Sequence, residues 1–412
     1  MTARGAVARP PILLHCQHLL GLGHVQRAAL LARALAKRGE HVLFVTGGLP
    51  VPGLELGGVE PVALPPLAAA DEAASTIARP DGRPPDARYL AERRAALLAL
   101  LVRHDPAIVL LELFPFGRHA LAFELGPLLL QLAADRARRG DAAPRVAVSV
   151  RDIVVSKKNP SWYELSVVAV IMQWVDRVLV HGSPDLIPLD RTFGLAGALA
   201  DRLVYTGYVV PDPAPPGEAT PRGEVVVSGG GGRVAGPLFR AALAARALAP
   251  AAAALPWRLI TGPYLPADVQ AELAAEAAAL PPQAGRPGVV VERFRDDFPA
   301  LLRGAALSIS QAGYNTVLDV LQSGVRAVVV PFEGSGDEQP LRARLLAARG
   351  RLTVVPESEL GPARLAAAME AALAAPDLPA PARLDTGGAA RAAALLAGMV
   401  DGVVAARRGG PG

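Results

Sequence analysis

One histidine of this 412-residue chain lies where acid–base chemistry is expected. His24 ends the sequence Gly21-Leu22-Gly23-His24, which follows a predicted strand at 11–16 and precedes a helical pattern over 25–37. Imidazole titrates near neutral pH, so a histidine on this loop could accept a proton as a general base. The alternative is a polar residue at a helix start that only hydrogen-bonds locally.

Two carboxylates end predicted strands in the same half of the chain. Glu112 follows the strand at 107–111, and Asp152 lies just beyond the strand at 146–150. Either could orient His24 or serve as the base itself, and an ion pair with one of the many arginines is an equally good alternative. Arg27, one turn beyond His24, could attract a phosphate or be solvated. We expect no metal site, because the other histidines lack ligand spacing and neither HExxH nor DxD occurs.

The stretch 306–344 could bind a phosphorylated ligand. It predicts a strand at 306–310, a Gln311-Ala312-Gly313 turn, a helix at 315–322 and a strand at 327–331. A helix that starts behind a glycine turn offers free backbone N–H groups to a phosphate. Asp319 could accept hydrogen bonds from a ribose, and Glu338 and Gln339 could approach a sugar, so we predict half of a nucleotide-sugar site. The alternative is a capping box made by Thr316 and Asp319.

The same plan of strand, glycine loop and helix occurs twice, which predicts two Rossmann-like domains of the α/β class with parallel sheets that face an interdomain cleft. The second copy begins with a strand at 224–227 and the loop Ser228-Gly229-Gly230-Gly231-Gly232-Arg233. We predict an N-terminal domain at 1–210, a Pro-rich linker at 211–223, a C-terminal domain at 224–385, and a helix with a tail at 386–412 that could cross back. The first loop lacks the third glycine of GxGxxG, and no acid ends the second strand, so an NAD enzyme is disfavoured.

Composition narrows the class of protein further. Cys16 is the only cysteine, which excludes disulfides within the chain and favours a reducing compartment. The formal net charge is +4 without a basic run, so we expect no nucleic-acid partner. No apolar run is long enough for a signal peptide or a membrane span, and we therefore expect a cytoplasmic protein, for which docking to a membrane surface stays open.

These motifs resemble the GT-B glycosyltransferases, and among them family 28, which includes the peptidoglycan GlcNAc transferase. GlyLeuGlyHis at 21–24 and SerGlyGlyGlyGly at 228–232 resemble its two glycine loops, and the text at 310–319 and 331–339 resembles its donor motif. QHLLGLGHVQRA, ELFPFGR and SVRDI are closest to a bacterial branch of predicted glycosyltransferases. The resemblance covers most of the chain.

The resemblance implies roles for individual residues. They add to the catalytic candidates His24, Glu112 and Asp152, which come from the residues themselves. Phe294 and Arg295 match the place that holds the uracil, with core packing as the alternative for Phe294. Asp319 matches the acid that holds the ribose, and Arg342 stands where the peptidoglycan enzyme has Asn. The expected donor-binding residues are Gly21, Gly23, Ser228, Gly229, Gly230, Gly231, Gly232, Arg233, Phe294, Arg295, Gln311, Gly313, Asn315, Thr316, Asp319, Glu338 and Gln339.

The expected activity is the metal-independent transfer of a sugar from a UDP-sugar, as co-substrate, to an unknown acceptor, with inversion and without a cofactor. Helix dipoles and loop amides would stabilise the leaving diphosphate. Two alternatives stay open: a nucleotide-sugar hydrolase in which His24 activates water, and a non-catalytic nucleotide-sugar binding protein. The oligomeric state is not predicted.

Overall fold

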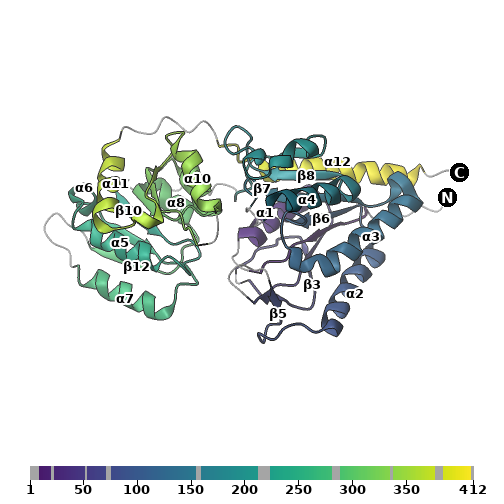
Figure 1. Cartoon of the computed structure of the whole chain (residues 1–412), viewed down its shortest axis with the longest axis horizontal. Coiled ribbons are helices and arrows are strands. Elements are labelled where there is room, and N and C mark those ends of the chain that lie inside the picture. Colours follow the sequence, from purple (N-terminus) through teal and green to yellow (C-terminus); the bar gives the residue numbers. More distant parts are fainter. Residues whose placement is uncertain are drawn as a thin grey trace, which may run out of the picture. The chain divides into compact units, whose positions relative to one another are not determined.

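The computed structural model describes residues 9–19, 23–51, 53–70, 76–154, 159–211, 223–280, 288–334, 337–375 and 384–409. The chain divides into two compact units, whose elements are labelled in Figure 1. Unit 1 is formed by Met1–Val210 together with Asp385–Gly412, and unit 2 by Pro211–Leu384. Most of the predicted linker, residues 212–222, lies outside the described residues.

Unit 1 is built on a seven-stranded sheet in the order β3-β2-β1-β6-β7-β8-β9. All neighbouring strands in it are parallel. The strands are β1 (Ile12–His15), β2 (Val42–Thr46), β3 (Glu60–Ala63), β6 (Ile108–Glu112), β7 (Arg145–Arg151), β8 (Arg177–His181) and β9 (Leu203–Tyr205). The central strands are runs of buried aliphatic residues, as expected for a parallel sheet covered on both faces.

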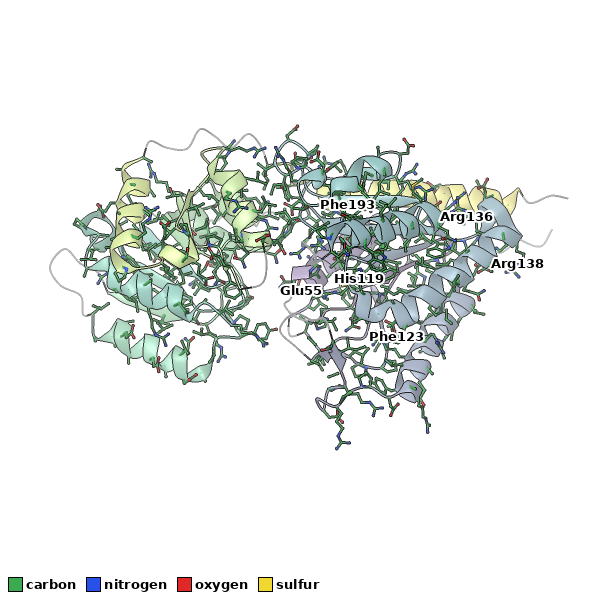
Figure 2. All side chains as sticks on the ribbon, viewed as in Figure 1. Glu55, His119, Phe123, Arg136, Arg138 and Phe193 are labelled. Carbon is green, nitrogen blue, oxygen red and sulfur yellow. The ribbon has the colours of Figure 1, made fainter. Side chains whose placement is uncertain are left out.

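Helices cover both faces of this sheet. The helices α2 (Ala87–His104), α3 (Ala122–Arg139) and α4 (Pro160–Trp174) contribute to the core on one face, and α1 (Gly23–Lys37) and α12 (Gly388–Arg408) to the core on the other. In α1 the buried residues Val25, Ala28, Ala32 and Leu35 recur at intervals of three and four and form one apolar stripe. Phe193, labelled in Figure 2, packs edge-on against Phe116 with ring centroids 5.2 Å apart.

The helix α12 comes from the far end of the chain and is part of unit 1. Its Ala392, Leu396 and Val400 share a core cluster with α1, and Figure 1 shows α12 in yellow along this unit. At its start, the Tyr208 N–H donates to the Asp385 carbonyl over 2.7 Å. Within the described part of the chain, α12 is the one helix long and apolar enough to cross a membrane by length and composition. Its apolar stripe is buried in unit 1.

The order of the strands reverses between β1 and β6. The strands β2 and β3 follow on one side of β1, whereas β6 to β9 follow on the other. In open parallel sheets, ligands bind beyond the carboxyl ends of the strands at such a reversal. Because β1 ends at His15 and β6 ends at Glu112, this position is formed by the segments that follow those two residues.

Unit 2 repeats this plan with a six-stranded parallel sheet in the order β12-β11-β10-β13-β14-β15. The strands are β10 (Glu224–Ser228), β11 (Trp257–Ile260), β12 (Val289–Glu292), β13 (Ala305–Ser310), β14 (Ala327–Val329) and β15 (Thr353–Val354). The helices are α5 (Gly236–Arg246), α6 (Pro250–Ala253), α7 (Ala267–Ala278), α8 (Phe298–Gly304), α9 (Tyr314–Ser323), α10 (Glu338–Ala347) and α11 (Pro362–Ala374). The reversal falls between β10 and β13, whose last residues Ser228 and Ser310 are register partners.

The predicted α/β class with two parallel sheets is confirmed. The described part of the segment 53–86 contains β3 and also a short antiparallel pair, β4 (Ala68–Ala69) and β5 (Ile77–Ala78). Strands of two residues are too short to show the alternation by which a strand is predicted.

Candidate functional site

His24 and Glu112 form a hydrogen-bonded pair in unit 1. His24 is the second residue of α1, and Glu112 is the last residue of β6, so both lie at the reversal of strand order. The His24 Nδ1 lies 2.9 Å from the Glu112 Oε1. The same Oε1 accepts from the Arg27 Nη2, and the Arg27 side chain is only 2% exposed. Arg27 is therefore an internal ion-pair partner, and the alternative that it is solvated was wrong, whereas its attraction for a phosphate stays a prediction.

The charges around this pair determine which group carries the proton. Burial alone would raise the pKa of Glu112, but the charge of Arg27 and the hydrogen bond with His24 lower it to about 2. Burial and the charge of Arg151 lower the pKa of His24 to about 3, although Glu112 opposes this. At neutral pH, Glu112 is thus an anion that only accepts, and His24 is neutral. The Arg27 Nη2, a donor, also lies 3.3 Å from the His24 Nδ1. The shorter contact of Nδ1 with the Glu112 carboxylate, 2.9 Å, requires a donor, so we assign the His24 proton to Nδ1, which leaves Nε2 with a lone pair.

Polar side chains continue from Glu112 across the next strands of the sheet. The Ser149 hydroxyl, on β7, lies 2.7 Å from the Glu112 Oε2 and 3.0 Å from the His181 Nε2. On the other side of its ring, the His181 Nδ1 lies 2.8 Å from the Thr206 hydroxyl. Glu112, Ser149 and His181 lie at or near the carboxyl ends of β6, β7 and β8, and Thr206 directly follows β9. Parallel strands bring these ends to one edge of the sheet.

Asp152 lies elsewhere on this edge. It is 1% exposed, its Oδ2 accepts from the Tyr208 hydroxyl over 3.5 Å, and its side chain lies against Gly182. The structure thus places it beside the segment that leaves unit 1, whereas Glu112 is the carboxylate at His24.

Arg118 is the last residue of the motif ELFPFGR, and no role was predicted for it from the sequence. It follows β6 with a left-handed backbone, φ 59°, which is uncommon for a residue with a side chain. Among the described residues it has no hydrogen-bond or ion-pair partner, and burial lowers the pKa of its guanidinium. Glu112 and Arg151 both lie near enough to affect that pKa.

In unit 2 the glycine loop 229–232 connects β10 to α5 and packs tightly on the loop after β11. The Tyr264 N–H donates to the Gly231 carbonyl over 3.0 Å. Gly232 and Gly262 both have φ of 88°, and a Cβ on Gly262 would lie 2.7 Å from the Gly231 carbonyl carbon. Both positions require glycine, so the loop places its backbone where side chains do not fit. Such a loop at a helix start can bind a phosphate with its N–H groups.

The start of α9 lies beside this loop. Gly313 is the N-cap of α9 and provides no side-chain hydrogen bond, so the first N–H groups of the helix have no cap from that residue. A Cβ on Gly230 would lie 3.5 Å from the Thr316 Oγ1, which shows that the loops after β10 and β13 meet. Thr316 lies inside the first turn of the helix. The alternative of a capping box with Asp319 was therefore wrong.

Asp319 is a half-buried carboxyl group that lies one turn into α9. Among the described residues it has no hydrogen-bond or ion-pair partner. Burial raises its pKa to about 7, because no donor compensates the lost hydration of the charged form. A ligand with hydroxyl groups would supply such donors.

Glu338 and Gln339, expected to approach a sugar, also make internal contacts. The Arg342 Nη2 donates to the Glu338 Oε1 over 2.9 Å, and its Nη1 donates to the Ala312 carbonyl over 3.2 Å. The Gln339 Oε1 accepts from the Phe332 N–H over 3.1 Å, which leaves the amide nitrogen of Gln339 as its donor for a ligand. Arg342 is 2% exposed and supports the 311–313 turn from behind.

The segment after β12 also borders this edge, since the Gly262 N–H donates to the Arg293 carbonyl over 3.0 Å. Phe294 is 65% exposed, so its alternative interpretation as a core residue was wrong. The Arg295 guanidinium is bound by Asp297 and Glu292.

The other residues expected to bind the donor differ in burial. Gly21 lies outside the described residues, and Gly23 begins α1. Ser228 ends β10 with a buried side chain, Gln311 and Thr316 are partly buried, and Arg233 and Asn315 are exposed. Among the described residues no group of three or more His, Cys, Asp or Glu side chains could hold a metal ion.

Ser149 and Thr206 were not predicted as site residues, and His181 was considered only as a metal ligand. Each is a polar residue near the end of a predicted strand. That position was the signal used for Glu112, and applying it to every strand would have identified these residues.

The fold is that of known glycosyltransferases. The structure of the calicheamicin glycosyltransferase CalG4 is similar over 95% of this chain and 99% of that chain, with a TM-score of 0.62 and 19% identity. The structure of Acinetobacter baumannii MurG is similar over 94% of this chain and 100% of that chain, with a TM-score of 0.59 and 17% identity. The chain therefore has the GT-B fold.

The second half of the chain is similar to a known domain family. Residues 225–394 match the model of the glycosyltransferase family 28 C-terminal domain. One relative is the UDP-N-acetylglucosamine--N-acetylmuramyl-(pentapeptide) pyrophosphoryl-undecaprenol N-acetylglucosamine transferase of Methylobacterium sp. (strain 4-46), which is 34% identical over 128 residues. The match covers 31% of this chain and about a third (34%) of that protein. The protein of the same name from Ralstonia nicotianae is 45% identical over 74 residues, 18% of this chain and 20% of its own length. Residues 225–394 are thus similar to a family 28 C-terminal domain, within a chain of GT-B fold, and the predicted resemblance is confirmed.

Replacing Gly262 tests whether the packing of the two loops matters for anion binding. In Gly262→Ala the new Cβ would displace the 229–232 loop, and we expect pyrophosphate affinity to fall at least about tenfold, the effect of losing one charge-assisted hydrogen bond. Isothermal titration calorimetry measures this affinity. Gly361→Ala, in the same unit and with no atom within 4 Å of its new Cβ, is the control. Unchanged affinity in a folded Gly262→Ala protein would contradict the assignment of this loop.

Proposed function

We propose that the protein transfers a sugar from a nucleotide sugar, specifically a UDP-sugar, to a hydroxyl group of an acceptor, with inversion and without a metal ion. The residues assigned to the donor lie in unit 2, and the residues assigned to proton transfer lie in unit 1. Both units therefore contribute to the proposed reaction.

The observation that carries this proposal is the arrangement around Asp319. A glycine loop, a helix N-terminus without a side-chain cap and a carboxyl group that has no partner in the described part of the chain follow neighbouring strands of one sheet. The N–H groups and the positive ends of α5 and α9 suit a diphosphate. Asp319, one turn further, suits the two hydroxyl groups of a ribose. These are the chemical groups of a nucleoside diphosphate in their covalent order.

In the proposed reaction the His24 Nε2 takes the proton of the acceptor hydroxyl. The acceptor oxygen then forms a bond to the anomeric carbon of the sugar, and the bond from that carbon to the diphosphate breaks with its electron pair on the diphosphate. Glu112 stabilises the imidazolium that forms on His24, which matters because burial disfavours the charged ring. Attack opposite the leaving group inverts the anomeric centre.

The choice of uridine as the base is supported by the relatives, whose names specify UDP-N-acetylglucosamine as donor. Those names also specify an acceptor linked to pyrophosphoryl-undecaprenol, whereas CalG4 is named for calicheamicin. We propose a lipid-linked or small-molecule acceptor accordingly. A cytoplasmic location is part of the proposal, because it suits a chain with Cys16 as its only cysteine.

A nucleotide-binding experiment tests the donor assignment. We expect UDP to raise the thermal unfolding temperature more than GDP, dTDP or NAD, because a ligand that binds only the folded state stabilises it by mass action. If Asp319 binds as the carboxylate, UDP affinity should rise by up to about tenfold per pH unit below 7 and level off above its pKa of about 7.

Asp319→Asn is the matched control, since it keeps the shape and removes the titration. It should bind UDP more weakly and lose this part of the pH dependence, whereas the titration of the ligand phosphate affects both proteins alike. Equal affinity and equal pH profiles in the two proteins would remove Asp319 from the site.

Replacing His24 tests the proposed base. His24→Ala should lower UDP release from a UDP-sugar in the presence of acceptor by about 10²- to 10⁴-fold, with UDP affinity unchanged. His41→Ala, an exposed histidine of unit 1, should have no effect. Turnover in His24→Ala close to that of the unmodified protein would exclude His24 as base, and equal UDP release without any acceptor would indicate hydrolysis.

Chelation tests the absence of a metal requirement. The proposal assigns stabilisation of the leaving diphosphate to backbone N–H groups and helix ends, so adding EDTA should leave the rate unchanged. Inhibition that added Mg²⁺ or Mn²⁺ reverses would contradict a metal-independent reaction.

A further inference from the structure

The hydrogen bonds behind Glu112 have a direction that the ionised carboxylate imposes. A carboxylate only accepts, so the Ser149 hydroxyl must donate to the Glu112 Oε2, 2.7 Å away. A serine hydroxyl has one proton, and this contact uses it. At the next contact, 3.0 Å from the Ser149 Oγ, the donor must therefore be the His181 Nε2–H.

The Thr206 hydroxyl is the next hydrogen-bond donor in this series. His181 is fully buried, and burial together with the charge of Arg27 lowers its pKa to about 3, so the ring is neutral with a single N–H. With the proton on Nε2, the Nδ1 lone pair accepts from the Thr206 hydroxyl over 2.8 Å. Two carbonyls compete for the same hydroxyl, that of Gly207 at 3.0 Å and that of Val180 at 3.4 Å. The His181 contact is the shortest of the three, and polarisation by the Glu112 anion favours it further.

Thr206 is itself held in place at the end of this series. Its N–H donates to the Val180 carbonyl over 3.0 Å, and its carbonyl accepts from the Arg391 Nε of α12 over 2.6 Å. The hydroxyl therefore starts from a backbone position fixed by β8 and by the C-terminal helix.

We propose that Thr206, His181 and Ser149 form a directional relay of three hydrogen bonds that fixes the Glu112 carboxylate and, through it, the His24 tautomer with an unprotonated Nε2. The three are positioning residues, because each acts on His24 only through Glu112. Without the relay the Glu112 Oε2 loses its hydroxyl donor, and the carboxylate can rotate away from the His24 Nδ1. The catalytic consequence rests on the proposed function, whereas the tautomers do not.

The first experiment reads the tautomers directly by ¹H–¹⁵N correlation spectra of the full chain labelled with ¹⁵N-histidine. His24→Ala and His181→Gln assign the two rings. The proposal expects the proton on Nδ1 in His24 and on Nε2 in His181. Finding the opposite tautomer at His181 would overturn the relay whether or not the protein is an enzyme.

The second experiment removes one donor at a time. Thr206→Val keeps the shape without the hydroxyl, and Thr206→Ser restores the hydroxyl. Ser149→Ala removes the contact to Glu112, and Ser166→Ala is the control, because Ser166 in α4 donates only to the Tyr163 carbonyl in the described structure. In Ser149→Ala we expect mixed tautomers at His24 and turnover lowered by about 10- to 100-fold, as for loss of one hydrogen bond to a charged group, with UDP affinity unchanged.

Thr206→Val should show a smaller loss of turnover, and Thr206→Ser should recover it. Thermal unfolding of each variant separates misfolding from a change at His24. A folded Ser149→Ala protein with an unchanged His24 tautomer would overturn the proposal. If no nucleotide sugar is turned over by the unmodified protein, the proposed function fails, and the tautomer spectra still decide the relay.

Discussion

The buried carboxylate of Glu112 is the charge on which the site in unit 1 depends. A carboxylate removed from water is several kcal/mol less stable unless donors replace the water. Here Arg27 and His24 from α1, and Ser149 from β7, contact its two oxygens. Because the Glu112 carboxylate only accepts hydrogen bonds, each of these partners must be a donor. The charge of Glu112 thus sets the direction of the hydrogen bonds on both sides of the reversal of strand order.

Unit 2 is built on the opposite principle. Its proposed binding groups are backbone N–H groups, which glycines such as Gly232 and Gly262 allow to approach closely, and the Asp319 carboxyl group has no donor among the described residues. Burial of Asp319 disfavours the charged form until a ligand provides hydrogen bonds. Unit 1 thus contains a charge that the protein itself satisfies, whereas Asp319 in unit 2 has no such partner among the described residues.

Local sequence patterns were sufficient for most of the fold. Two parallel sheets, two glycine loops and the strand ends at Glu112 and Ser310 follow from aliphatic runs and glycine positions within a few residues of each other. The patterns failed where a short motif had two structural solutions. Thr316 and Asp319 have the spacing of a capping box, but α9 begins at Tyr314, and the cap is Gly313. Phe294 is apolar, yet it is exposed because its segment follows an edge strand, β12.

The sequence by itself determined the α/β class, the position of His24 at a helix start and the resemblance to a family 28 domain, because each depends on residues close together in the chain. Only the tertiary structure decided that His24 hydrogen-bonds to Glu112, 88 residues away, and that Arg27 is neutralised by the same carboxylate. It also decided that Ser149, His181 and Thr206 form consecutive hydrogen bonds that lead to Glu112. Those contacts follow from the order of strands β1, β6, β7, β8 and β9 in the sheet. Strand order is set by packing over the whole unit, so no local sequence pattern predicts it.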